Sequence, residues 1–243
     1  MKRPRGRRPP ARTGPSYGGP HYGGSQFGAP NFAGNPPAKR RQKPNRFVSA
    51  GLTTFTFLVV LWVVHIVNAF MHHRLIYYGI RPGDTDGLWG ILFAPFIHVD
   101  FTHLVMNSSA VAILLFVLAL SGQREVWISS IIIALVAGGA VWYFGNPYTV
   151  HVGASGLIYG WMAYLIVRGF FTRNATQIML GIIIGFSYAG SVWGMLPGQE
   201  GVSWQGHLFG AIGGVIAAAS GVASNKKDND QLGAPQRGIN HGR

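Results

Sequence analysis

The chain has 243 residues, no cysteine and a formal net charge of +13. Without cysteine there can be no disulfide, thiol nucleophile or thiolate metal site. Only 11% of the residues are charged, against roughly 25% in a soluble domain, so the composition favours a membrane protein.

Residues 1–46 form a basic tail that is rich in Gly and Pro and lacks apolar periodicity. They hold eleven of the twenty Lys and Arg residues. Such a segment buries too little apolar surface to offset the entropy of ordering, so disorder is predicted. Because the tail directly precedes an apolar run, it is interpreted as a cytoplasmic flank of a membrane span, not as a nucleic-acid-binding region. It is also a candidate for contact with anionic lipid at the inner surface.

Six apolar runs follow, and each is interpreted as a membrane-spanning helix. A bilayer core of about 30 Å needs roughly 20 helical residues. The shorter runs must therefore extend into the semi-polar residues at their ends. The runs are 48–70, 104–120, 127–144, 156–171, 177–196 and 208–223. The prediction is an all-α membrane domain of six helices over 47–223, with a polar, disordered tail over 224–243.

A further apolar patch at 88–97 is too short to cross the membrane. It is interpreted as a loop in the membrane interface, because Pro95 hinders the alternative, an extended start of the second helix. Lys and Arg are abundant in the inner segments and absent from the 145–154 and 197–203 loops. This bias predicts cytoplasmic N- and C-termini for a multi-pass protein, with the plasma membrane as the expected location.

Polar residues at membrane depth are costly and usually functional. With the N-terminus inside, helices two, four and six all run from outside to inside. His103 and Asn107 lie at the start of helix two, Ser155 lies at the start of helix four, and His207 lies at the start of helix six. Hydropathy alone therefore places these side chains at similar depth, near the outer face.

Glycines recur at four-residue spacing on helices four and six. Small faces of this kind let helix backbones approach closely in lipid. If the two faces meet, Ser155 and His207 come within side-chain reach of each other; the alternative is ordinary small-residue packing, which is common. The glycines are Gly156 and Gly160 on helix four and Gly206, Gly210 and Gly214 on helix six.

A serine hydroxyl is a poor nucleophile unless a neighbouring base takes its proton. Neutral His207 can do so and can later protonate the leaving amine. No carboxylate lies at this depth except Asp100, so a dyad is predicted instead of a triad. Ser155 begins a helix, and its free backbone N–H groups point toward the developing oxyanion. His103 and Asn107, at i and i+4 on one helix face, can add side-chain donors.

Several other polar and aromatic residues have more than one interpretation. His98 and Asp100 are either functional or loop anchors that hydrogen-bond the backbone. His151 and His65 fall outside the pattern and are interpreted as structural. Tyr159, one turn into helix four, is either a core aromatic or a support packed under the catalytic histidine.

These residues resemble the rhomboid family of intramembrane serine proteases over roughly 48–223. The resemblance rests on three motifs in matching order on matching helices. A GxSG string alone also occurs in soluble hydrolases, but the three motifs together are specific. They are His103-x-x-x-Asn107, Gly153-Ala154-Ser155-Gly156 and His207-x-x-Gly210-x-x-x-Gly214.

The resemblance implies that Ser155 and His207 form the catalytic dyad of a six-helix bundle. It implies an oxyanion hole made by His103, Asn107 and the backbone amide of Ser155, with Tyr159 stacked on His207. Rhomboids need no metal or nucleotide, and they cleave single-pass membrane proteins near the outer face.

The resemblance also implies that 71–97 is a membrane-embedded first loop. The fifth helix and the 197–203 cap loop would gate the path of the substrate. The chain departs from the family at one place: rhomboids often carry a Trp-Arg pair in the first loop, whereas here Trp89 is followed by Gly90. This departure bears on how the loop is anchored, not on the catalytic set.

Two other functions compete with proteolysis. A rhomboid-like pseudoprotease would bind membrane clients without cutting them, but such relatives typically lose the serine or the histidine, and both are present. A channel or transporter that relays protons through histidines is disfavoured, because no carboxylate lies within the predicted helices and the inner half lacks a polar path. The expected partners are transmembrane protein substrates and the lipid bilayer.

Overall fold

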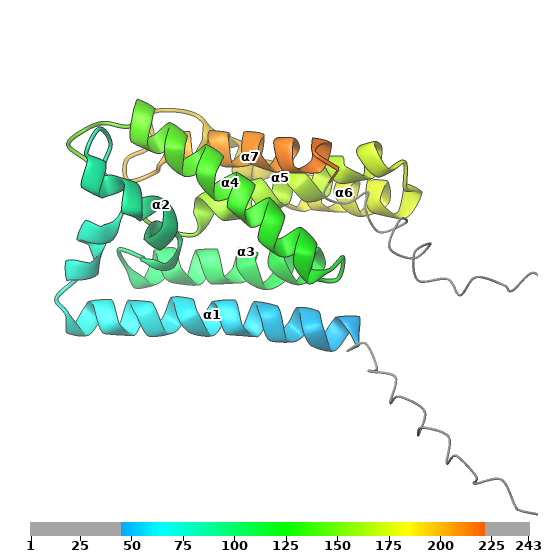
Figure 1. The fold of residues 1–243 in the computed structure, drawn as a ribbon, viewed down its shortest axis with the longest axis horizontal. Coiled ribbons are helices and arrows are strands. Elements are labelled where there is room, and N and C mark those ends of the chain that lie inside the picture. The colour runs from blue at the N-terminus through cyan, green and yellow to red at the C-terminus, as the bar shows by residue number, and fades with distance from the viewer. Residues whose placement is uncertain (1–44, 222–243) are drawn as a thin grey trace, which may run out of the picture. The chain divides into compact units, whose positions relative to one another are not determined.

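The computed structural model describes residues 45–221, so the predictions for both tails fall outside the described residues. Within 45–221 the fold is helical and has no strand beyond one isolated β-bridge (Figure 1). The α-helices are α1 (Arg46–Phe70), α2 (Gly90–Phe93), α3 (Phe101–Ala119), α4 (Gln123–Phe144), α5 (Ser155–Thr172), α6 (Ala175–Ser187) and α7 (Trp204–Ala219). Short 3-10 helices are η1 (Arg74–Tyr78), η2 (Thr85–Trp89), η3 (Ala94–Phe96) and η4 (Ala189–Met195).

Three described helices, α1, α3 and α4, are long and apolar enough to cross a membrane. The number is four if α6 and η4, which meet at a bend of 67°, are taken as one span. Helices α5 and α7 are shorter, at 18 and 16 residues. The count of six spans therefore stays a prediction.

The fifth predicted helix, 177–196, is broken in the structure. α6 ends at Ser187, and the chain continues from Ala189 as the 3-10 helix η4. Residues 187–191 read SYAGS, and serine and glycine both weaken a helix at such a point. Hydropathy does not register the break, because apolar residues continue on both sides of it.

The other helices differ from the apolar runs at their ends. α3, α4 and α7 begin before the runs, so the expected extension into semi-polar residues is confirmed. The predicted end of the sixth helix at residue 223 is wrong, because α7 ends at Ala219. Gly221 has φ +75° directly after that end, a left-handed conformation with which glycine commonly terminates helices.

Helix α5 lies at the centre of the fold and contacts α3, α4, α6 and α7. Its contact with α7 is made through glycine. A Cβ atom at Gly210 would collide with the carbonyl of Gly156, and one at Gly214 would collide with the carbonyl of Gly160. The structure thus has the meeting of glycine faces that the spacing left open against ordinary small-residue packing.

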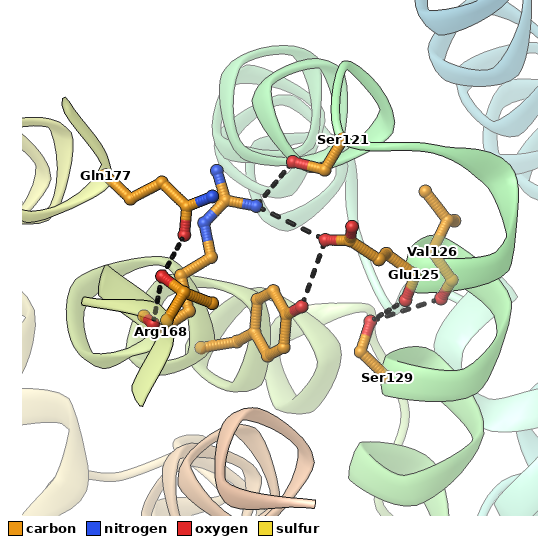
Figure 2. Close-up of polar contacts among 8 residues, drawn as sticks. Ser121, Glu125, Val126, Ser129, Arg168 and Gln177 are labelled. Atoms are coloured by element: carbon orange, nitrogen blue, oxygen red, sulfur yellow. Dashed lines mark hydrogen bonds and ion pairs between the residues drawn. The ribbon is translucent and has the colours of Figure 1, made fainter. Parts of the chain in front are cut away.

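The C-terminal end of α5, far from Ser155, holds a buried ion pair (Figure 2). Arg168 is 3% exposed, and its Nη1 lies 3.5 Å from Glu125 Oε2 and 2.5 Å from Ser121 Oγ. The hydroxyl of Tyr164 donates to the same Glu125 oxygen at 3.1 Å. The pairing is consistent with the rule that buried charges are held in pairs and hydrogen-bonded.

This ion pair corrects one part of the sequence analysis. Because α4 begins at Gln123, four residues before the apolar run, a carboxylate does lie within a helix, namely Glu125. The same end of α5 is tied to α6, since the Thr172 hydroxyl donates to Gln177 Oε1 at 2.9 Å. The network therefore joins α4, α5 and α6 at the end of the bundle away from Ser155.

Candidate active site

Ser155 is the first residue of α5, and a strained turn precedes it. Gly153 has φ +114°, a backbone conformation that other residues rarely adopt. A Cβ atom there would lie 2.6 Å from His103 Cε1 and 3.4 Å from Asn107 Nδ2. Both side chains, which come from α3, therefore face the backbone two residues before Ser155. The structure brings together His103, Asn107 and the Gly153–Ser155 turn, as the sequence predicted.

The start of α3 is held by two residues whose roles the sequence left open. Asp100 caps the helix, because its carboxylate accepts from the His103 N–H at 2.8 Å, so its interpretation as a backbone anchor is confirmed. His98 does more than anchor a loop. It is fully buried, and its Nε2 lies 2.9 Å from Asn107 Nδ2.

The roles in the His98–Asn107 hydrogen bond follow from the chemistry of the groups. An amide nitrogen only donates, so His98 Nε2 accepts and the imidazole proton sits on Nδ1. Burial, helped by the neighbouring His103, lowers the pKa of His98 to about 4, which keeps the ring neutral and able to accept. His98 thereby fixes the orientation of the Asn107 amide and leaves that amide a second N–H.

His207 lies in the first turn of α7 and is held on two sides. Its ring stacks on Tyr159, with centroids 4.2 Å apart and an angle of 11° between the planes. Its Nδ1 lies 2.8 Å from the carbonyl oxygen of Gly194 in η4. A carbonyl only accepts, so Nδ1 carries the proton and Nε2 keeps a free lone pair. Tyr159 is thus a support under His207, one of its two predicted roles.

The segment η4 holds the His207 ring directly and also anchors Tyr159, on which that ring stacks. Gly194 accepts from the His207 ring, and the Tyr159 hydroxyl donates to the Ser191 carbonyl at 2.8 Å. The role of η4 could not be read from the sequence, because a backbone carbonyl carries no residue signature. Ser155 and His207 occupy the N-terminal ends of α5 and α7, beside the glycine contact between these helices.

A cavity of about 50 Å³ lies beside Ser155. Small residues form much of its wall, and its polar side chains are Ser155, His151 and Ser203. His151, interpreted from the sequence as structural and outside the pattern, therefore shares this cavity with Ser155. His65 lies on α1 and lines no part of it. Among residues 45–221, no group of three or more His, Asp or Glu side chains could hold a metal ion.

The first loop is anchored by backbone packing. Gly90 lies so close to the backbone of Gly79 and Ile80 that a Cβ atom would collide with it. The indole N–H of Trp142 in α4 donates to the Asp84 carbonyl at 2.8 Å. At the Trp89–Gly90 pair, this contact leaves no space for a side chain at position 90. The patch 88–97 forms separate short helices and is not an extension of α3.

Comparison with known proteins identifies the family of the chain. The family model described as "Rhomboid domain" matches residues 85–224, which include all three motifs. An uncharacterized protein of Mycobacterium tuberculosis is 42% identical over 191 residues, covering 75% of this chain and 79% of that protein. An uncharacterized protein of Mycobacterium leprae is 40% identical over 194 residues, covering 76% of each chain.

A more distant relative is named as a protease. Rhomboid-like protease 5 of Toxoplasma gondii is 27% identical over 139 residues, covering 56% of this chain and 16% of that protein. The family model spans more than half of the chain, and the mycobacterial relatives match most of it. The chain therefore belongs to the rhomboid family, and it is an integral membrane protein.

Proposed function

We propose that this protein is an intramembrane serine endopeptidase, with Ser155 as nucleophile and His207 as its base. One observation carries the proposal. Nδ1 of His207 donates to the Gly194 carbonyl, so the lone pair of Nε2 is the one left for a proton from a hydroxyl. The stacking on Tyr159, one turn after Ser155 in the same helix, keeps this ring at the end of α5 where Ser155 lies.

The reaction would proceed by acyl transfer. Ser155 Oγ attacks the scissile carbonyl while its proton passes to His207 Nε2, and the Gly194 carbonyl stabilises the imidazolium that results. The oxyanion receives hydrogen bonds from the Ser155 backbone N–H, from a ring N–H of His103 and from the second N–H of Asn107. His207 then protonates the leaving amine, and a water molecule hydrolyses the acyl-enzyme.

The cavity beside Ser155 supports the hydrolytic step. A water molecule needs roughly 10–15 Å³ of such space and two to four polar partners. The cavity volume of about 50 Å³ exceeds this need, and Ser155, His151 and Ser203 supply polar atoms on its wall. The cavity can therefore hold water beside Ser155.

The proposal extends to topology and substrate. Six spans with both termini in the cytoplasm would place Ser155 near the outer face of the plasma membrane. The substrates would be single-pass transmembrane proteins whose helices unwind easily at small residues. The basic segment 1–46 would contact anionic lipid at the inner surface, at about 1 kcal/mol per basic residue near that surface. Deleting this segment should then weaken binding to anionic vesicles.

The test uses the purified full chain in liposomes with a single-pass substrate that carries small residues and a Gly or Pro near the outer end of its helix. Wild type is compared with Ser155→Ala and His207→Ala. We expect a discrete product from wild type, formed about 10³-fold more slowly or not at all by both variants. Product that persists in folded Ser155→Ala would refute the assignment. Folded wild type that cuts none of a panel of such substrates and resists fluorophosphonate labelling would favour a pseudoprotease.

A further inference from the structure

A second histidine–serine pair lies next to the proposed dyad. His151 precedes Ser155 by four residues, and Ser203 precedes His207 by four residues. The Nδ1 atom of His151 lies 2.8 Å from Ser203 Oγ. One hydrogen bond therefore joins the segment that leads into α5 to the residue that directly precedes α7. The sequence motifs do not include this pair, and beyond lining the cavity it has no part in the proposed dyad or oxyanion hole.

The donor and acceptor roles along this contact can be deduced from its far end. The Thr149 hydroxyl donates to the Asn146 carbonyl at 2.6 Å. Its oxygen must then accept from His151 Nε2, which lies 2.9 Å away. With its proton on Nε2, His151 accepts at Nδ1, so the Ser203 hydroxyl donates to it. Every group in the chain from Ser203 to Asn146 thus has a partner and a defined role.

The backbone holds both members of the pair in place. His151 forms two backbone hydrogen bonds with Ile80, each of 2.9 Å, in an isolated antiparallel bridge. The Ser203 carbonyl accepts from the His207 N–H at 3.1 Å. Burial lowers the pKa of His151, which favours the neutral ring that can accept from Ser203. The pair is therefore a fixed connection between two separately anchored segments.

We propose that His151 and Ser203 are positioning residues, which hold the turn before Ser155 and the start of α7 in the register that the dyad requires. The proposal rests on the proposed function of Ser155 and His207. Catalytic groups must be held to within a fraction of an ångström by supporting hydrogen bonds. The Gly156–Gly210 contact sets the spacing between the two helices below the dyad. The hydrogen bond that Ser203 donates to His151 sets the same spacing on the other side of the dyad.

The pair is not itself the catalytic dyad, although a serine that donates to a histidine has the required chemistry. An acyl-transfer nucleophile needs oxyanion donors beside it. His103 and Asn107 face Gly153, in the turn that carries Ser155, whereas the Ser203 hydroxyl is bonded to His151. Ser203 instead occupies the N-cap position of α7. A fluorophosphonate would modify Ser155 if Ser155 is the nucleophile, and Ser203 if the His151–Ser203 pair were the dyad.

The experiment measures kcat and KM in liposomes for His151→Ala, Ser203→Ala and the double variant, beside wild type and Ser155→Ala. Each single change should lower kcat by about tenfold while KM and the unfolding temperature change little. The double variant should be no slower than the slower single variant, because both changes remove one shared hydrogen bond. His151→Asn, whose Oδ1 can stand close to the place of Nδ1, should recover most of the loss.

The fluorophosphonate labelling rate gives a second measurement that needs no substrate. Labelling should occur on Ser155 and should slow by about the same factor as kcat in each variant. An unchanged labelling rate in folded His151→Ala and Ser203→Ala, or losses that multiply in the double variant, would overturn the positioning role. An adduct on Ser203 would overturn it in favour of a Ser203–His151 dyad. If labelling stays on Ser155 and product disappears in Ser155→Ala, the proposed function stands even where the positioning role fails. An adduct on Ser203 would count against both.

Discussion

The close contact between α5 and α7 makes Gly210→Ala the most informative single substitution. The new Cβ would fall on the Gly156 carbonyl oxygen. This neighbour is backbone and cannot rotate away, so α7 must move from α5 by about 1 Å. Overpacking of this kind costs about 1–3 kcal/mol, and replacing glycine by alanine within a helix returns about 1 kcal/mol. The net loss of stability should therefore be about 1 kcal/mol.

The effect on cleavage should be much larger than the effect on stability. Ser155 directly precedes Gly156, and His207 lies one turn before Gly210. A separation of the two helices moves nucleophile and base apart, and a misplacement of 1 Å costs about 10²-fold in rate. We expect a loss of this size in the liposome cleavage assay, with only a small drop in the unfolding temperature of Gly210→Ala.

A matched substitution separates this effect from a general response to alanine. Gly139 lies in α4, and among the described residues no atom lies within 4 Å of a Cβ built there. Gly139→Ala should therefore keep wild-type cleavage and equal or slightly higher stability. If Gly210→Ala cleaved within twofold of wild type while folded, the claim that glycine contact sets the geometry of the dyad would be refuted.

Three further outcomes are expected. Arg168→Met should lower stability by about 3–5 kcal/mol because it removes one charge of a buried ion pair. Adding Glu125→Met should restore most of the loss in an unfolding assay, and full stability of the single variant would contradict this. Gly194→Ala places a Cβ 3.2 Å from His207 Nδ1 and onto the Tyr159 hydroxyl, so the cleavage rate should fall about tenfold. Gly190 lies in the same segment but has open space at its Cβ, so Gly190→Ala should cleave at the wild-type rate. Asn107→Ala should reduce kcat by about 10²–10³-fold with little change in KM, since an oxyanion donor acts mainly in the transition state; a change confined to KM would argue against that role.

The sequence predicted the part of the site that depends on periodicity. The i, i+4 spacing of His103 and Asn107 predicted a shared face of α3, and the four-residue spacing of glycines made the α5–α7 contact one of two possibilities. Both follow from the 3.6-residue helical repeat, which does not depend on the rest of the fold. The family resemblance added the stacking of Tyr159 on His207, which spacing alone left open.

The parts that escaped prediction depend on loops and on the backbone. His151 meets Ser203 across 52 positions of sequence, and each lies outside the regular helices. The Gly194 carbonyl that orients His207 belongs to η4, beyond a break that apolar composition conceals. Glu125 precedes the apolar run 127–144 and so lies outside the predicted helix. In the structure α4 begins at Gln123, and the buried carboxylate of Glu125 is paired with Arg168.

The central claim is that His207 activates Ser155, and active-site labelling tests it most directly. Full-length protein in liposomes would be treated with a fluorophosphonate, and the modified residue would be located by peptide mass. The account predicts one adduct on Ser155, which forms about 10³-fold more slowly in folded His207→Ala. Labelling of Ser155 at an equal rate in wild type and His207→Ala, or an adduct on another serine, would contradict it.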